Sequence, residues 1–151
     1  MRMVKPKIRP ASLNELPAVL ALYRQLNPDD PVLDLAAAER AWSALLTSGF
    51  VTTFVADVAG RLVSSCTLAI VPNLSRGARP YGVIENVVTD IAHRRQGMGR
   101  AVLHAALENA WNADCYKVLL ASGSKRESTL RFYEDAGFKR DAKTYFEIRR
   151  T

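Results

Sequence analysis

A basic turn with two glycines joins a strand-like segment to a helical pattern in the second half of this 151-residue chain. The turn reads Arg94-Arg95-Gln96-Gly97-Met98-Gly99, and Arg100 follows it. A helix N-terminus leaves backbone N–H groups without intrahelical partners and carries partial positive charge, so it attracts anions. Glycines let the backbone approach an anion closely, and arginines add full charges that suit phosphate. The pattern therefore predicts a strand–turn–helix unit that holds a phosphorylated ligand.

The glycine spacing excludes two common phosphate-binding motifs. A dinucleotide-binding turn needs a third glycine three residues after the second, where this chain has Val102. A P-loop needs lysine and then serine or threonine directly after its last glycine, where this chain has Arg100 and Ala101. The pattern that remains is R-x-x-G-x-G. Taken alone, it is also compatible with a plain helix-capping turn that carries solvated arginines.

Length and composition indicate one globular domain over residues 1–151, because 48% of the residues are hydrophobic and 24% are charged. We find no apolar run near the ~20 residues that span a membrane and no secretory signal segment, so we expect a cytoplasmic protein. Cys66 and Cys115 lie in strand-like apolar surroundings and are expected to pack as small buried hydrophobes. With two histidines besides, the chain shows no metal-ligand spacing, and we expect no metal.

The net charge of +6 is concentrated in the half that contains the basic turn. Residues 1–90 hold nine Lys and Arg against eight Asp and Glu, whereas residues 91–151 hold twelve against seven. Such an excess is also a footprint of nucleic-acid binding. However, no helical pattern here combines a basic face with an aromatic platform. A small phosphorylated ligand explains the excess more simply, so we expect neither a nucleic-acid nor a membrane partner.

Periodicity and turn residues predict an alternation of strands and helices, which is typical of an α/β domain. Strands are expected at 5–9, 50–58, 61–71, 81–89, 116–121 and 144–149, with a hairpin turn at Ala59-Gly60. Helices are expected at 12–26, 34–48, 98–112 and 128–135. The first of these should begin with a capping box formed by Ser12 and Glu15. Leu35 and Trp111 are expected to face inward from the second and third helices.

Four motifs carry a resemblance to a known family. They are Ile84-Glu85-Asn86-Val87-Val88, the Arg94-x-x-Gly97-x-Gly99 turn, Cys115-Tyr116-Lys117 and Phe132-Tyr133-Glu134-x-x-Gly137-Phe138. Together they resemble the GNAT superfamily of N-acetyltransferases, and particularly its glucosamine-phosphate and other small-amine acetyltransferases. The resemblance implies a mixed, mostly antiparallel sheet of six to seven strands with helices on both faces. It also implies a parallel pair of strands, 81–89 and 116–121, that splay apart.

The resemblance further implies acetyl-CoA as co-substrate. The backbone N–H groups of Gln96, Gly97, Met98, Gly99 and Arg100 would hold the pyrophosphate, and Arg94 and Arg95 would add charge. The free edge formed by Val87, Val88 and Thr89 would pair with the pantetheine arm. An N–H of Val87 or Val88 would also donate to the thioester carbonyl, and oxyanion donors of this kind are worth ~3 kcal/mol each.

Glu85 is the expected catalytic base, because it is the only acidic residue in the strand 81–89. Burial in the sheet would raise its pKa and suit it to accept a proton from the amine. A salt bridge to an arginine and simple solvent exposure are the alternatives. By the resemblance, Tyr133 would donate a hydrogen bond or proton to the leaving thiolate; the alternative is a core tyrosine beside Phe132. Phe132 and Phe138 are expected in the core.

Two positions depart from the family pattern. Arg126 stands where the family often has an asparagine that binds pantetheine, so Arg126 or Ser128 would take over contacts to the cofactor. Ala121 stands where glucosamine-phosphate acetyltransferases have an acidic residue, which puts an amino-sugar substrate in doubt. The loops 26–32 and 72–80 would build the acceptor pocket, and 144–149 would be the dimer contact if the protein forms a homodimer.

The function expected from these observations is acetyl-CoA-dependent transfer of an acetyl group to a primary amine, by direct attack. The acceptor is expected to be a small molecule. Peptide or protein N-termini are the alternative within this class. A non-catalytic module that binds CoA and regulates another protein is the alternative outside it.

Overall fold

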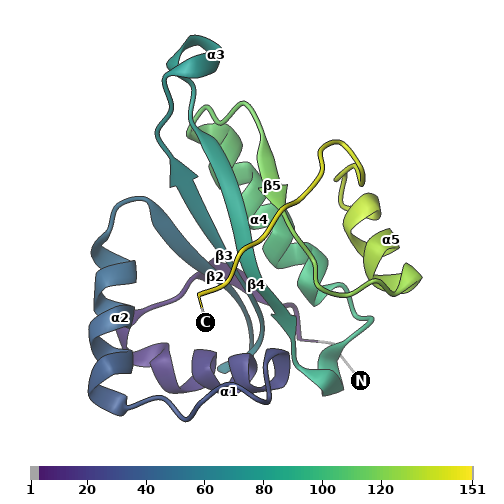
Figure 1. The fold of residues 1–151 in the computed structure, drawn as a ribbon. Helices are drawn as coiled ribbons and strands as arrows, with labels where there is room; N and C mark the ends of the chain where they lie inside the picture. Colours follow the sequence, from purple (N-terminus) through teal and green to yellow (C-terminus); the bar gives the residue numbers. More distant parts are fainter. Residues whose placement is uncertain (1–3, 151) are drawn as a thin grey trace.

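The computed structural model describes residues 4–150, which form a five-stranded sheet with helices on both faces (Figure 1). The strands lie in the order β1 (Lys7–Pro10), β2 (Val51–Val58), β3 (Arg61–Val71), β4 (Tyr81–Thr89) and β5 (Val118–Leu120). The first four are antiparallel, and β5 is parallel to β4. The α/β class and the mixed, mostly antiparallel sheet are therefore confirmed.

Two helices pack on one face of the sheet and one long helix on the other. The helices are α1 (Leu16–Leu26), α2 (Leu35–Thr47), α4 (Met98–Asn112) and α5 (Glu127–Asp135), with short turns η1 (Leu13–Glu15), α3 (Ser75–Ala78) and η2 (Ile91–His93). Within residues 4–150, no helix is long and apolar enough to cross a membrane.

The core consists of two clusters, one on each face. On the α4 face, Val102, Leu103 and Ala106 are fully buried against strand residues such as Leu68 and Ile84. On the other face, α1 and α2 pack on Val55 and Val88. Each large aliphatic side chain buried in this way contributes about 1.5–3 kcal/mol.

Two side chains expected to be buried are exposed. Leu35 is 65% and Trp111 51% exposed. Leu35 is the first residue of α2 and Trp111 the next to last of α4, so each lies at a helix end. The apolar periodicity in the sequence therefore extends beyond the part of each helix that packs on the sheet.

The hairpin turn and the first helix start follow local sequence rules. Ala59 and Gly60 have φ values of 52° and 87°, as tight turns between twisted strands require. The Ser12 N–H donates to Glu15 Oε1 at 2.9 Å, so the capping box forms, and it opens η1 directly before α1. Arg9 pairs with both Glu15 (2.7 Å) and Asp57 (2.9 Å) and so links this helix start to β1 and β2.

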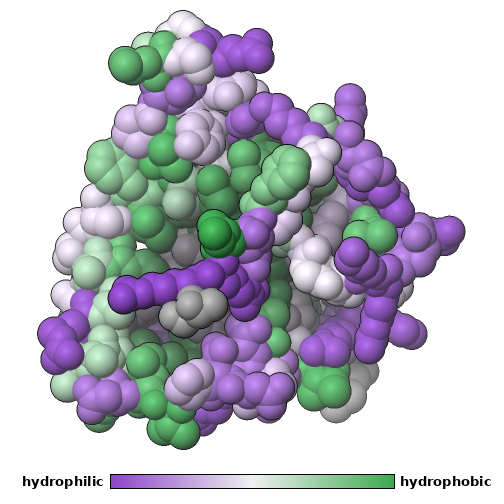
Figure 2. Space-filling model, in the orientation of Figure 1, coloured by the Kyte–Doolittle hydropathy of each residue, from purple (hydrophilic) through white to green (hydrophobic). Residues whose placement is uncertain are grey.

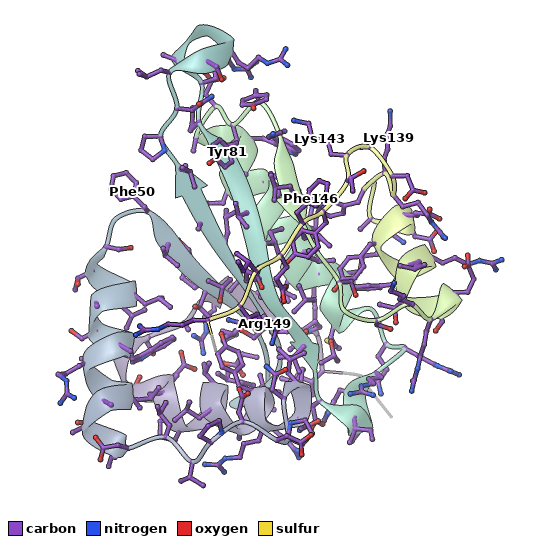
Figure 3. All side chains as sticks on the ribbon, in the orientation of Figure 1. Phe50, Tyr81, Lys139, Lys143, Phe146 and Arg149 are labelled. Carbon is purple, nitrogen blue, oxygen red and sulfur yellow. The ribbon has the colours of Figure 1, made fainter. Side chains whose placement is uncertain are left out.

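The expected last strand, 144–149, is not a strand. Residues 139–150 are exposed, and in the view of Figure 1 this segment, in yellow, runs in front of β4. Phe146 and Arg149 lie on this side of the sheet (Figure 3). The neighbouring β5 is only three residues long, shorter than the expected 116–121, and so offers few backbone groups to anchor a further strand. The part of the chain that the structure describes thus has five strands instead of six to seven.

Candidate active site

A bulge in β4 shapes the centre of the predicted site. Between two paired positions β3 advances from Ser65 to Thr67, whereas β4 advances from Glu85 to Val88, so β4 carries one extra residue. Asn86 within it has φ 54°, a left-handed conformation that asparagine tolerates. Ile84 packs on the α4 face and Val88 on the α1–α2 face, although residues four apart share a face in a regular strand. The bulge therefore turns the second half of β4 over.

The strands β4 and β5 separate directly before this bulge. Their ladder runs from the Gly82–Val118 pair to the Ile84–Leu120 pair and, within residues 4–150, ends there. In the part of the chain that the structure describes, Thr89 and Val88 pair with β3 and not with β5. The backbone of 85–89 is thus open toward β5, which confirms the expected split of the parallel pair. The predicted ligand contacts of Val87, Val88 and Thr89 would be made at this edge.

The basic turn leads from the open edge into α4. Arg95 (φ 60°) and Gly97 (φ 81°) adopt left-handed conformations, and Gly97 is the N-cap of α4. Among the described residues no side chain caps the first turn of α4, and that turn contains no acidic residue. All residues from Arg94 to Gly97 are exposed, and so is Arg100, whereas Met98 is half-buried. The geometry suits a phosphate group, because the helix N–H groups and the arginine charges are accessible together.

Gly99 is buried in the first turn of α4, and its lack of a side chain leaves room for a second helix to pack there. A methyl group on Gly99 would lie 3.0 Å from Thr89 Oγ1 and 3.1 Å from Phe132 Cζ. Phe132 belongs to α5, so α5 rests on the first turn of α4. This packing joins α5, which also carries Tyr133, to the first turn of α4 next to Thr89, the last residue of β4.

Tyr133 is a half-buried phenol in an aromatic group. Its ring centroid lies 5.1 Å from that of Phe132 and 6.3 Å from that of Phe138, both in edge-to-face geometry. Phe132 and Phe138 pack against the α4-face core, as expected. Burial raises the pKa of Tyr133, and the nearby Cys66 and Glu85 raise it further. The phenol therefore keeps its proton at neutral pH and can donate a hydrogen bond.

Glu85 is exposed, which contradicts the burial expected from the sequence. Among residues 4–150 it takes part in no ion pair within 4 Å, so of the two structural alternatives the salt bridge is wrong and solvent exposure is observed. Its neighbour across the ladder is Thr67, whose Oγ1 lies 3.3 Å from both Thr53 Oγ1 and the Tyr23 hydroxyl. Glu85 thus stands beside a short row of hydroxyl groups.

Arg126 and Ser128 lie at the start of α5. Arg126 is its N-cap, its backbone N–H points to Ser124 Oγ at 3.4 Å, and both side chains are exposed. Figure 2 shows a mostly hydrophilic surface over α5. The ligand contacts expected for Arg126 and Ser128 remain predictions, as do those of the basic turn.

The cysteines are structural. Cys66 is fully buried and Cys115 is 3% exposed, as expected. Burial raises the pKa of Cys66 to about 12, and its Sγ donates to the Val102 carbonyl at 3.4 Å. A thiol held in this state is a poor nucleophile. Within the described residues, no three His, Cys, Asp or Glu side chains are grouped to hold a metal.

Comparison with known proteins decides the family. The model of the acetyltransferase (GNAT) family matches residues 18–138. The chain belongs to this family. The GNAT protein is 34% identical over 138 residues to the glucosamine 6-phosphate N-acetyltransferase of Trypanosoma brucei brucei, covering 91% of each chain. It is 30% identical over 135 residues to the glucosamine 6-phosphate N-acetyltransferase 1 of Oryza sativa subsp. japonica, covering 87% of this chain and 80% of that one.

A solved structure is also similar. The putative acetyltransferase from Agrobacterium tumefaciens superposes with a TM-score of 0.91 at 46% identity, covering 95% of this GNAT chain and 99% of the other. The N-acetyltransferase family expected from the sequence motifs is thus confirmed, and GNAT acetyltransferases use acetyl-CoA.

Sequence reasoning missed three features of the GNAT site: the bulge at Asn86, the hydroxyl row of Tyr23 and Thr67, and Asp90. Asp90 directly precedes η2, is only 5% exposed, and accepts a hydrogen bond from Gln25 of α1, 65 residues earlier. His93 has its Nδ1 2.6 Å from Asp90 Oδ2. An asparagine in a strand was the only local sign of the bulge, and nothing near Asp90 in the sequence indicates its partner in α1.

Proposed function

We propose that this protein transfers the acetyl group of acetyl-CoA to the primary amine of a small molecule, by direct attack of the amine on the thioester. One observation carries the proposal: the open edge of β4 leads directly into the uncapped, arginine-flanked N-terminus of α4. That arrangement offers backbone partners for an extended arm and, at its end, partners for phosphates.

Acetyl-CoA supplies an activated thioester, and the protein's own residues would bind and orient it. Gln96, Gly97, Met98, Gly99 and Arg100 would offer N–H groups to the pyrophosphate, with charge from Arg94 and Arg95. Val87, Val88 and Thr89 would pair with the pantetheine arm, and Arg126 or Ser128 would add a contact from α5. A backbone N–H at Val87 or Val88 would stabilise the developing oxyanion.

Glu85 and Tyr133 would carry the two proton movements. Glu85 is exposed and can accept a proton from the amine directly or through a water. Tyr133 keeps its phenolic proton and would donate a hydrogen bond to the departing thiolate sulfur. The buried cysteines support direct attack over a covalent enzyme intermediate.

The acceptor is proposed to be a small hydrophilic amine that enters between the loops 26–32 and 72–80. The two relatives named glucosamine 6-phosphate N-acetyltransferase favour a phosphorylated amino sugar. Ala121, in place of an acidic residue, weighs against that acceptor. A peptide N-terminus is the alternative acceptor.

Two further expectations belong to this proposal. The exposed 144–149 segment, with Phe146 86% and Ile148 97% exposed, would pair with a second copy in a homodimer. Light scattering on the purified protein measures this state. A cytoplasmic location is proposed from the composition and is checked by fractionating cells that express the protein.

Thiol release from acetyl-CoA tests the proposed function. The protein is offered a panel of amines that contains glucosamine 6-phosphate, unphosphorylated amino sugars, polyamines and short peptides. Release of CoA with one class identifies the acceptor. If no amine is consumed while CoA still raises the melting temperature, the protein is a non-catalytic CoA-binding module and the proposal is wrong.

A further inference from the structure

The side chain of Gln25 reaches from α1 to Asp90 and Ile91, which lie between β4 and the basic turn. Its Nε2 donates to Asp90 Oδ1 at 2.8 Å, and the Ile91 backbone N–H donates to its Oε1 at 2.9 Å. Both ends of one amide are thus used at the point where β4 ends and η2 begins. A single side chain of α1 therefore restrains Asp90 and Ile91, which lead into the turn.

Asp90 is the other half of this contact. It is 5% exposed, its backbone N–H donates to the Val63 carbonyl at 2.8 Å, and its Oδ2 lies 2.6 Å from His93 Nδ1. The hydrogen bond from Gln25, and then that from His93, lowers the pKa of Asp90. Arg61 Nη2 also lies 3.7 Å from Asp90 Oδ2. A buried carboxylate is costly unless hydrogen bonds satisfy it, so Asp90 favours the arrangement that keeps Gln25 and His93 as partners. That arrangement fixes η2.

The basic turn itself has few constraints on its outer side. Arg94 Nε donates to the Thr89 carbonyl at 3.2 Å and Gln96 Nε2 to the Ala92 carbonyl at 3.3 Å, both at exposed positions. The buried residues that border the turn are Asp90 on one side, which the exposed Gln25 side chain contacts, and Gly99 on the other. An anion site built of backbone N–H groups binds well only when these groups are already in place.

We propose that Gln25 is a positioning residue for the acetyl-CoA-binding turn, so that α1 sets the affinity for CoA without touching it. The inference rests on the proposed function of that turn. Without Gln25, the residues that lead into the turn are less restrained, and CoA binding must then order the turn. The loss falls on binding and spares the chemical step, because Glu85 and Tyr133 lie on other elements.

The test compares Gln25→Ala with Arg24→Ala, an exposed residue of the same helical turn. We expect Gln25→Ala to raise the Kd of CoA, measured by calorimetry, and the KM of acetyl-CoA about tenfold, with kcat within about twofold. Arg24→Ala should change neither value. Equal CoA affinity in Gln25→Ala and wild type, or equal losses in the two variants, overturns the inference.

Two measurements cover misfolding and failure of the proposed function. Asp90→Asn keeps the shape of the side chain. In a double-mutant cycle, the loss of CoA affinity that Asp90→Asn causes should be smaller in the Gln25→Ala background than in wild type; additive losses contradict the inference. Hydrogen exchange of the free protein needs no CoA. Gln25→Ala should speed exchange of the Ile91 and His93 amides, which are hydrogen-bonded to Gln25 and Asp90, and leave those of α4 unchanged. Unchanged exchange at Ile91 and His93 overturns the inference even if the wild-type protein binds CoA.

Discussion

Phe132 closes over Gly99: a methyl group on Gly99 would lie 3.1 Å from the Phe132 ring, and 3.0 Å from Thr89 Oγ1 on the other side. This contact joins the helix that carries Tyr133 to the first turn of the helix proposed to bind pyrophosphate. The two parts of the proposed site therefore share one packing contact.

Gly99→Ala should disturb both parts. The methyl group requires Phe132 or Thr89 to move, and Thr89 Oγ1 is held 2.9 Å from Ser64 Oγ. We expect a loss of about 1–3 kcal/mol in unfolding free energy, as for other overpacked sites, and weaker CoA binding. Urea unfolding and calorimetry measure the two effects. Gly123→Ala is the control, since no atom of the described residues 4–150 lies within 4 Å of its Cβ position. Equal effects of the two substitutions would refute the packing argument.

Glu85→Gln should lower kcat about 10²-fold, because glutamine cannot accept the amine proton. The Kd of CoA should stay unchanged, because Glu85 is not among the residues proposed to bind it. Steady-state thiol release and calorimetry measure these values. Glu39→Gln, an exposed carboxylate on α2, serves as control. A kcat within about threefold of wild type would remove Glu85 from the mechanism.

Tyr133→Phe should leave the fold intact while it slows the reaction. Phenylalanine keeps the edge-to-face contacts with Phe132 and Phe138, so the melting temperature should shift by only about 1–2 °C. Loss of the hydroxyl should lower kcat by about tenfold or more, because the departing thiolate loses its donor. A large drop in melting temperature with normal kcat would instead identify Tyr133 as a core residue only.

The Glu15 carboxylate should make the stability of the folded protein depend on pH. Its hydrogen bonds with Arg9 lower its pKa from 4.5 to about 2. Because the folded-state pKa is the lower one, the contribution is present above about pH 5 and is lost as the pH falls toward 2. Glu15→Gln keeps the capping pattern but not the charge. The melting temperatures of wild type and variant should therefore differ at pH 7 and converge toward pH 2; a constant difference would contradict this assignment.

Local chemistry explains what was predictable. The capping box at Ser12, the turn at Ala59-Gly60 and the glycine turn at Gly97 each depend on residues that are neighbours in sequence. Their conformations follow from backbone sterics and short-range hydrogen bonds. The motifs around Glu85 and Tyr133 likewise indicated the family, which the comparisons confirm.

What only the tertiary structure decided depends on partners far away in the chain. The bulge at Asn86 exists in the pairing of β4 with β3, and Glu85, next to it, is exposed instead of buried. The 144–149 segment has the composition of a strand, but it forms none beside β5, an edge strand of only three residues. Asp90 finds its partner Gln25 65 residues earlier. The sequence by itself determined the strand–turn–helix unit, because its geometry is local; the surroundings of Glu85 and the restraint on the turn were decided by packing between distant segments.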